Sequence, residues 1–465
     1  MLSYFKINDP FRLLPLLLLA FVIKLPALLN PVIYSEATHW FVIGEAMHGS
    51  SMYHGIWDGM APFSASIYQA FTWLFGRSAL ALLILGTLVT FAQAVIINNL
   101  SISAKIFDSN TYLPALIYVL LASSHPAFFT LSPVLIGLTF ILLGLGKLLN
   151  HVEFRAKTDI HIIMIGLYFG ISTLFYLPFI VIFPIALLLL GLFSNTVIRR
   201  YFLLLLTSFM PLIIAFFYYW LISDHPAYFI SNFILFINNA SSYINIGWVN
   251  GVISLGFSFF FMSIGLLSIG KQRRLNNYQF RIAQLFFVLA LLMMSMLIVE
   301  RPISYYSLVV LIPFATYFTV HLIALIKKPL VVFTLNLMLL IGPVLLLWSI
   351  SNNWIPQLNK VPKTTPNQQH INIVKNKHIM VLGSAKHLYS QATLAGPFYD
   401  WELSRDFFTK LDYYDNLVFL QAQITKSNPE IIIDLEDNWS EISHKLPMVS
   451  KNYYLYQPKV WKRRK

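Results

Sequence analysis

Long apolar runs separated by short polar segments occupy most of the first 351 residues. The run at 281–299, for example, approaches the roughly 20 apolar residues that a helix needs to cross a ~30 Å hydrocarbon layer. The pattern predicts about eleven membrane-spanning helices, at 11–29, 79–100, 111–123, 127–149, 160–175, 177–195, 201–222, 249–269, 281–299, 303–326 and 329–351. The stretches 111–149 and 160–195 fit either one kinked helix or two short spans each. If each stretch forms two spans, the basic loops all fall on the same side of the membrane, as the positive-inside rule requires.

Two segments between the predicted spans have helical periodicity without being long enough to cross a membrane. Residues 30–78 form a long loop in which 36–48 and 63–76 repeat apolar positions at helical spacing, and 223–248 does so through Phe229 and Phe233. We expect short helices there that lie at the membrane surface.

The pattern changes after residue 352, where a polar linker begins. The sequences HIMVLGS and EIIIDLE are typical of buried strands, and helical stretches are expected at 384–392, 400–410 and 415–427. The tail KNYYLYQPKVWKRRK favours a closing β-hairpin. We therefore expect a transmembrane domain at 1–351, containing the loop 30–78, and a small α/β domain at 352–465.

Composition supports a lipid environment and excludes several functions. Hydrophobic residues make up 57% of the chain and charged residues only 11%, proportions that are not those of a soluble protein. There is no cysteine, which excludes disulfides, thiolate catalysis and cysteine-bound metals. The fold class expected is an all-α polytopic membrane protein with a small C-terminal extracytoplasmic α/β domain, and the lipid bilayer is its first partner.

The net charge of +13 reflects topology rather than nucleic-acid binding. With a cytoplasmic N-terminus, the inner loops hold 14 Lys and Arg residues, against Arg77, Arg301 and Lys24 at outer positions. This bias predicts a multi-pass protein of the bacterial inner membrane with an extracytoplasmic loop 30–78 and C-terminal domain. No nucleic-acid partner is expected.

Acids are rare in the first 330 residues, and three of the nine lie in the loop 30–78: Glu36, Glu45 and Asp58. Glu36 precedes His39 by three residues and Glu45 precedes His48 by three, a spacing that di-iron helical bundles use for metal binding. A nine-residue offset puts the two pairs on opposite sides of one helix, so the histidines also fit ordinary interfacial positions. A single divalent ion held by Glu36 or Asp58 with a ligand phosphate is a further alternative.

Glu36 and Asp58 each allow a structural and a functional interpretation. Glu36 follows the first span closely, where an acid must face water, a partner or a cavity. It is either a solvated acid at a helix start or a reacting carboxylate. Asp58 lies in a turn sequence before Pro62 and either caps the following helix or takes part in the chemistry.

The loop resembles the first outer loop of the GT-C glycosyltransferases, the integral membrane enzymes related to the protein mannosyltransferases and the lipid A aminoarabinose transferases. The residues that carry the resemblance, in order, are Glu36, Trp40, Gly49, Tyr53, Asp58 and Pro62. The resemblance implies transfer of a sugar from a polyprenyl-phosphate donor to an acceptor, with Glu36 as the acceptor-activating or metal-binding carboxylate.

The chain departs from that family at two places. Ser35-Glu36 stands where the family commonly has Asp-Glu, and Ala61-Pro62 stands where it has Pro-Pro or Lys-Pro-Pro. The chain also resembles a group of multi-spanning membrane proteins from gliding-type bacteria that share its Trp-Asp and Phe-Gly-Arg-Ser segments, and no activity follows from that second likeness.

Sugar transfer also needs a cation for the leaving phosphate and surfaces for the sugar. Arg77 and Arg301 are candidate phosphate ligands, although Arg301 also fits a pair with Glu300. Tyr53 and Trp57 are candidates for stacking on sugar rings, although aromatic residues are common at membrane interfaces. The leading hypothesis is an inner-membrane glycosyltransferase with catalytic Glu36 and Asp58. The rivals are a non-catalytic scaffold in envelope biogenesis, surface export or gliding motility and, third, a transporter.

Overall fold

The computed structural model describes residues 2–464 except 8, 32–34, 155–158, 195, 223–226, 236–247, 272–275, 300–302, 327 and 356–367. The chain forms two compact units, neither continuous in sequence. Unit 1 comprises Met1–Val32, Ser78–Ile214 and Asn245–Lys360. Unit 2 comprises Ile33–Arg77, Ala215–Ile244 and Val361–Lys465, so it groups the loop 33–77 with the C-terminal residues.

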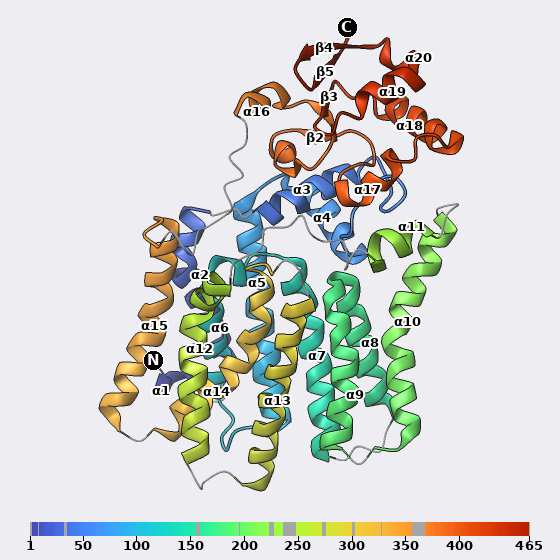
Figure 1. Cartoon of the computed structure of the whole chain (residues 1–465). Helices are drawn as coiled ribbons and strands as arrows, with labels where there is room; N and C mark the ends of the chain where they lie inside the picture. The colour runs from blue at the N-terminus through green and yellow to red at the C-terminus, as the bar shows by residue number, and fades with distance from the viewer. Residues whose placement is uncertain are drawn as a thin grey trace. The chain divides into compact units, whose positions relative to one another are not determined.

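Unit 1 is a bundle of apolar helices (Figure 1). In chain order its main helices are α2 (Leu13–Leu29), α5 (Ala79–Ser103), α6 (Leu113–Ala122), α7 (Pro133–Phe154), α8 (Asp159–Phe175), α9 (Ile182–Phe193), α10 (Ile198–Ile222, whose end falls in unit 2), α12 (Trp248–Lys271), α13 (Asn277–Val299), α14 (Ile312–Leu325) and α15 (Pro329–Ser351). Helices α7 and α8 pack along each other, as do α12 with α14 and α2 with α15.

The described part of the chain contains eight helices long and apolar enough to span a membrane and three shorter apolar helices. These match the predicted spans, so the expectation of a multi-pass helical membrane protein is confirmed. The two ambiguous stretches are each divided into two helices. A 3₁₀ turn at Pro126–Phe128 separates α6 from α7, and another at Leu177–Val181 separates α8 from α9. Each turn contains a proline, whose backbone nitrogen carries no hydrogen and so cannot donate the hydrogen bond that would continue a helix.

The helices of unit 1 begin and end where local chemistry dictates. The Ser78 hydroxyl accepts a hydrogen bond from the Ala81 N–H at the start of α5. At the start of α13, the Asn276 side chain accepts from the Gln279 N–H and the Gln279 side chain accepts in return from the Asn276 N–H, a reciprocal capping box.

The helical part of unit 2 contains α3 (Ser35–Ala46) and α4 (Pro62–Phe75), which pack against each other. Gly44 allows this close approach, because a Cβ there would lie 2.4 Å from the Tyr68 carbonyl oxygen. Both helices match the predicted periodic stretches. A short helix, α11 (Ala227–Phe229), continues into a π-helical turn at Ile230–Ile234, which is the described portion of the segment expected at 223–248.

The C-terminal part of unit 2 is a five-stranded sheet with helices around it, as the α/β pattern predicted. The strands β1 (His378–Leu382), β2 (Thr393–Leu394), β3 (Ile431–Asp434), β4 (Tyr453–Gln457) and β5 (Val460–Arg463) take the order β2-β1-β3-β5-β4. β1 runs parallel to β2 and β3, and β4–β5 is the expected hairpin. The helices are α16 (Gln368–Val374), α17 (Trp401–Phe408), α18 (Tyr414–Ser427), α19 (Trp439–Lys445) and α20 (Pro447–Ser450).

A single hydrophobic core ties unit 2 together. It contains residues of the sheet and of α17–α19, and it also contains Trp57 from the loop 33–77. The Trp57 indole packs against Phe398, Phe407 and Phe419 at centroid distances of 5.3, 5.4 and 5.7 Å. The loop is therefore an integral part of this unit rather than a free connection.

Candidate functional site

The candidate site is built on α3 and the turn before α4. Glu36 lies in the first turn of α3 and is partly exposed, and the helix dipole favours a carboxylate at this position. His39 follows by three residues, so the two side chains share a face of the helix. His39 is 8% exposed. The structure therefore places one partly exposed carboxylate beside one buried imidazole.

Asp58 is completely buried and is held by His39. Its Oδ2 lies 2.9 Å from His39 Nε2, and its Oδ1 accepts a hydrogen bond of 2.8 Å from the Met60 N–H. Burial by itself raises the pKa of the Asp58 carboxyl. The neighbouring His39 and, to a lesser degree, Lys386 lower the pKa by more than burial raises it, so the pKa lies below its ordinary value. The N-terminal cap of α4 is Ala61, so Asp58 fixes the turn rather than capping that helix.

The C-terminal residues of unit 2 contribute a second buried carboxylate, that of Asp400. Asp400 is completely buried, and its Oδ2 accepts a hydrogen bond of 2.6 Å from Lys386 Nζ, while its Oδ1 accepts from the Glu402 N–H and so caps α17. Tyr399 lies between the two pairs. The His39 ring stacks on it at 5.3 Å, and Lys386 Nζ is 5.4 Å from its centroid.

Backbone hydrogen bonds fix these side chains in register. The Trp57 N–H donates to the Pro397 carbonyl at 2.8 Å, and the Asp400 N–H donates to the Trp57 carbonyl at 3.3 Å. The burial of Tyr399 beside Asp58 and Asp400 raises the pKa of its hydroxyl well above the ordinary value. The arrangement brings together two buried carboxylates, a buried histidine, a buried neutral tyrosine and a partly exposed lysine.

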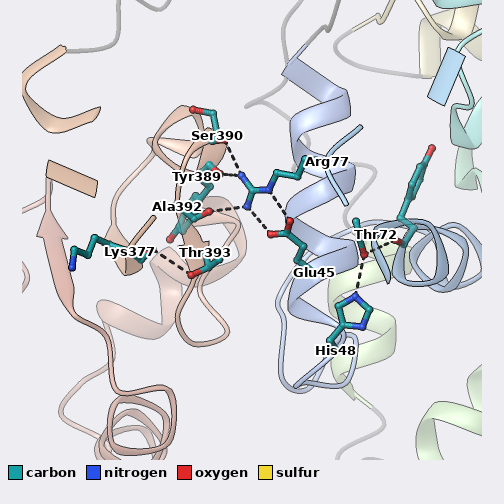
Figure 2. A network of polar contacts seen from close by, with 10 residues as sticks. Glu45, His48, Thr72, Arg77, Lys377, Tyr389, Ser390, Ala392 and Thr393 are labelled. Atoms are coloured by element: carbon teal, nitrogen blue, oxygen red, sulfur yellow. Dashed lines mark hydrogen bonds and ion pairs between the residues drawn. The ribbon is translucent and has the colours of Figure 1, made fainter. Parts of the chain in front are cut away.

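Arg77 is fully engaged in a clamp that Figure 2 shows from close by. Its Nε and Nη2 donate to the two oxygens of Glu45 at 2.8 and 2.7 Å. The remaining donors bind three backbone carbonyls of one short C-terminal segment, those of Tyr389, Ser390 and Ala392, at 2.8 to 2.9 Å. These contacts favour a structural role for Arg77 over the predicted binding of a phosphate.

The two candidate stacking aromatics are buried against protein. The Tyr53 hydroxyl donates to the Met60 carbonyl at 2.7 Å, and its ring packs among Tyr219, Phe229 and Phe233. Tyr53 has a φ of 70°, an unusual backbone conformation for a tyrosine, which the surrounding packing maintains. Trp57 is 6% exposed. Stacking of either ring on a sugar stays a prediction, and the described contacts of both are with protein.

The predicted metal ligands do not form a cluster. Within the described ranges, no group of three or more His, Asp or Glu side chains is arranged to hold a metal ion. Glu45 and His48, the second predicted pair, bind different partners. Glu45 binds Arg77, and His48 Nε2 contacts the Thr72 hydroxyl at 3.2 Å. Arg301 lies outside the described residues.

Sequence reasoning missed the partners of Asp58 and Asp400. It treated His39 as a partner for Glu36 or as an interfacial residue, and it did not single out Lys386, Tyr399 or Asp400. Lys386 and Asp400 lie more than 320 residues from Asp58 along the chain. No local pattern marks such a pairing, since it depends on how the loop and the C-terminal residues pack together.

The fold defines a class of protein, a multi-pass helical membrane protein whose fold is similar to that of a solved GT-C glycosyltransferase. The solved structure of ArnT from Cupriavidus metallidurans bound to undecaprenyl phosphate aligns with a TM-score of 0.56 at 12% identity, over 96% of this chain and 97% of that one. The resemblance noted in the sequence is thus confirmed at the level of the fold.

Two oligosaccharyltransferase structures from Archaeoglobus fulgidus also align, each with a TM-score of 0.48. AglB in complex with an inhibitory peptide and a dolichol-phosphate is 11% identical, over 95% of this chain and 72% of that one. The enzyme tethered with an acceptor peptide is 12% identical, over 98% and 74%. No protein-family model and no curated protein matches the sequence.

Proposed function

We propose that this protein is a glycosyltransferase of the bacterial inner membrane that transfers a sugar from a polyprenyl-phosphate carrier to an acceptor on the outer side. The observation that supports the proposal is the likeness in fold to ArnT over nearly the whole of both chains, since that enzyme was solved bound to undecaprenyl phosphate. The step from fold to activity is an analogy. The charge bias of the loops supports the outer location.

In this proposal Glu36 is the reacting carboxylate. Its partial exposure on the first turn of α3 leaves it within reach of a substrate, whereas Asp58 is completely buried and both of its oxygens bind protein groups. Glu36 takes the proton of the acceptor hydroxyl. The acceptor oxygen then forms a bond to the sugar C1 while the bond from C1 to the phosphate oxygen breaks, and the polyprenyl phosphate leaves with the electron pair.

Asp58 contributes by positioning. It holds His39, which lies one helical turn from Glu36, so the carboxylate and the imidazole keep a fixed relation on α3. If a divalent ion takes part, the partly exposed Glu36 carboxylate would bind it together with the donor phosphate, because hard cations prefer carboxylate and phosphate oxygens. Arg301 remains the proposed outer ligand for the leaving phosphate.

A second candidate function is a non-catalytic scaffold for envelope assembly, surface export or motility. Ser35 favours it, because the GT-C family commonly has an additional acid at this position. The buried network around Asp58 is compatible with either function, because it maintains the architecture of unit 2 in both.

The experiment that separates the two functions is complementation of a deletion strain by Glu36→Gln. Glu436→Gln, an exposed glutamate of the same unit, is the matched control. Membrane levels of each variant are measured alongside, and lipid-linked sugars are identified by mass spectrometry. We expect Glu36→Gln to be as abundant as the wild type but inactive, with the polyprenyl-phosphate sugar accumulating. Full complementation by Glu36→Gln would favour the scaffold.

A further inference from the structure

One charged side chain in unit 1 has no hydrogen-bond acceptor. Lys24, on α2, is 0% exposed, and its Nζ has no partner among the described residues. Lys24 Nζ lies over the ring of Phe129, 4.5 Å from its centroid. Among the described Lys, Arg, Asp and Glu side chains of this unit, Lys24 alone is completely buried.

The direction of Lys24 is unexpected for its helix. α2 is peripheral, and Leu18 and Leu25 on it are 68% and 45% exposed. Lys24 lies only five residues before the end of α2, about 8 Å along the axis. A lysine at that depth can extend its ammonium group to the membrane surface. Lys24 instead directs it into the bundle, where an unpaired charge is costly.

Lys24 faces an irregular segment of backbone. Residues Ser123–Ser132, between α6 and α7, are all buried although they lie outside the regular helices. Phe129 belongs to this segment, which packs tightly against α5: a Cβ on Gly86 would lie 2.1 Å from the Phe129 carbonyl oxygen, and the Leu131 N–H donates to the Leu82 carbonyl. Non-helical backbone within a membrane protein is tolerated where it is buried in protein or lines a cavity, and it often lines ligand sites.

The hydroxyl groups of this segment bond to groups other than Lys24. Ser123 and Thr130 donate to the carbonyls of Val119 and Pro126, and the Ser132 hydroxyl accepts from the Leu135 N–H. None of these groups lies within hydrogen-bond distance of Lys24 Nζ, so the Lys24 amine keeps its donors for a group that comes from outside the protein.

We propose that Lys24 binds the phosphate headgroup of a lipid that enters from the bilayer beside α2. A phosphate supplies both the negative charge and the acceptor oxygens that the site lacks. Neighbouring apolar surface suits the tail. α15 packs beside α2, with the Ser351 hydroxyl bonded to the Pro26 carbonyl, and Leu345 on α15 is 62% exposed. The lipid is a polyprenyl phosphate, and this identity alone rests on the proposed function.

The test is native mass spectrometry of the purified full chain with added undecaprenyl phosphate, undecaprenol or phosphatidylglycerol. We expect the wild type to bind undecaprenyl phosphate at least tenfold more tightly than undecaprenol, and Lys24→Met to lose that preference. Equal binding of the two lipids by the wild type, or an unchanged preference in Lys24→Met, would overturn the proposal.

Competition experiments distinguish the sources of the phosphate. Phosphatidylglycerol should displace undecaprenyl phosphate only weakly, and inorganic phosphate should not displace it. Full displacement by inorganic phosphate would contradict a lipid site. Lys24→Arg should retain part of the preference, and Lys328→Met, which removes an exposed lysine, should retain all of it. Failure of the transferase proposal is distinguishable, because Glu36→Gln would then complement while the lipid preference of Lys24 persists.

Discussion

The buried charges of the two units are treated in opposite ways. In unit 2, Asp58 and Asp400 are both completely buried, and each is paired with a cationic or titratable partner and with a backbone N–H. In unit 1, Lys24 is equally buried and has neither. Proteins rarely leave a buried polar group unsatisfied. In our proposal the network of unit 2 serves its own structure, whereas Lys24 binds a ligand.

The same contrast distinguishes two cations, Arg77 and Lys24, by whether their donors are already bonded to protein groups. Arg77 resembled a phosphate ligand in the sequence, but its donors are used by Glu45 and three carbonyls. Lys24 was only one more basic residue near the end of a span. Among the described residues, the completely buried cation without a hydrogen-bond partner is therefore one that the sequence did not single out as a phosphate ligand.

The largest effect should come from breaking the Asp58 pair. Asp58→Ala removes both hydrogen bonds and leaves His39 buried without its carboxylate, so we expect the free energy of unfolding of unit 2 to fall by about 3–5 kcal/mol. Denaturant titration combined with hydrogen exchange measures it. A loss below about 1 kcal/mol would show that the pair is not structural.

Removing the Arg77 clamp should cost less, because Glu45 is partly exposed. Arg77→Ala should destabilise unit 2 by about 2–3 kcal/mol, with faster amide exchange in residues 386–394. Arg77→Lys should recover only part of this, since a lysine cannot reproduce the forked geometry. Arg405→Ala, at an exposed position, is the control and should be neutral. An Arg77→Ala variant as stable as the wild type would contradict the clamp.

Gly86→Ala tests the segment that Lys24 faces. The new methyl group would overlap the Phe129 carbonyl oxygen, so α5 and the segment 123–132 must separate, at a cost of about 1–3 kcal/mol in unit 1. Thermal unfolding in detergent measures the effect. Gly256→Ala is the control, because a Cβ there meets no atom within 4 Å. Equal melting temperatures for the two variants would show that the packing is looser than described.

Lowering the pH should produce the smallest loss of stability, and one that depends specifically on Asp58. The pKa of Asp58 is lower in the folded protein than the ordinary value of about 4, so its contribution to stability is complete above that pH and is lost as the pH falls through the folded pKa. We expect the melting temperature of unit 2 to decline below pH 4. Asp58→Asn should be less stable at neutral pH and should show a shallower decline. Parallel profiles for the two proteins would contradict this assignment.

The spans were predictable because a bilayer requires long apolar runs, and the strands of unit 2 because Ile431–Asp434 is a short buried run between turn signals. The pairing of Asp58 with His39, and the clamp from Arg77 to residues near 390, were not, since they arise from packing between segments distant in sequence. The inward direction of Lys24 was hidden for another reason. α2 is apolar on nearly all sides, so no periodicity marks the face toward the bundle.

The most direct test of the contrast is the melting temperature of the wild type and Lys24→Met, each measured with and without undecaprenyl phosphate. Without lipid, Lys24→Met should melt at a higher temperature than the wild type, because the methionine removes a buried amine that has no hydrogen-bond partner. With lipid, the wild type should gain stability and the variant should not. A variant that melts lower than the wild type, and that lipid stabilises equally, would show that Lys24 is a structural residue and contradict the account.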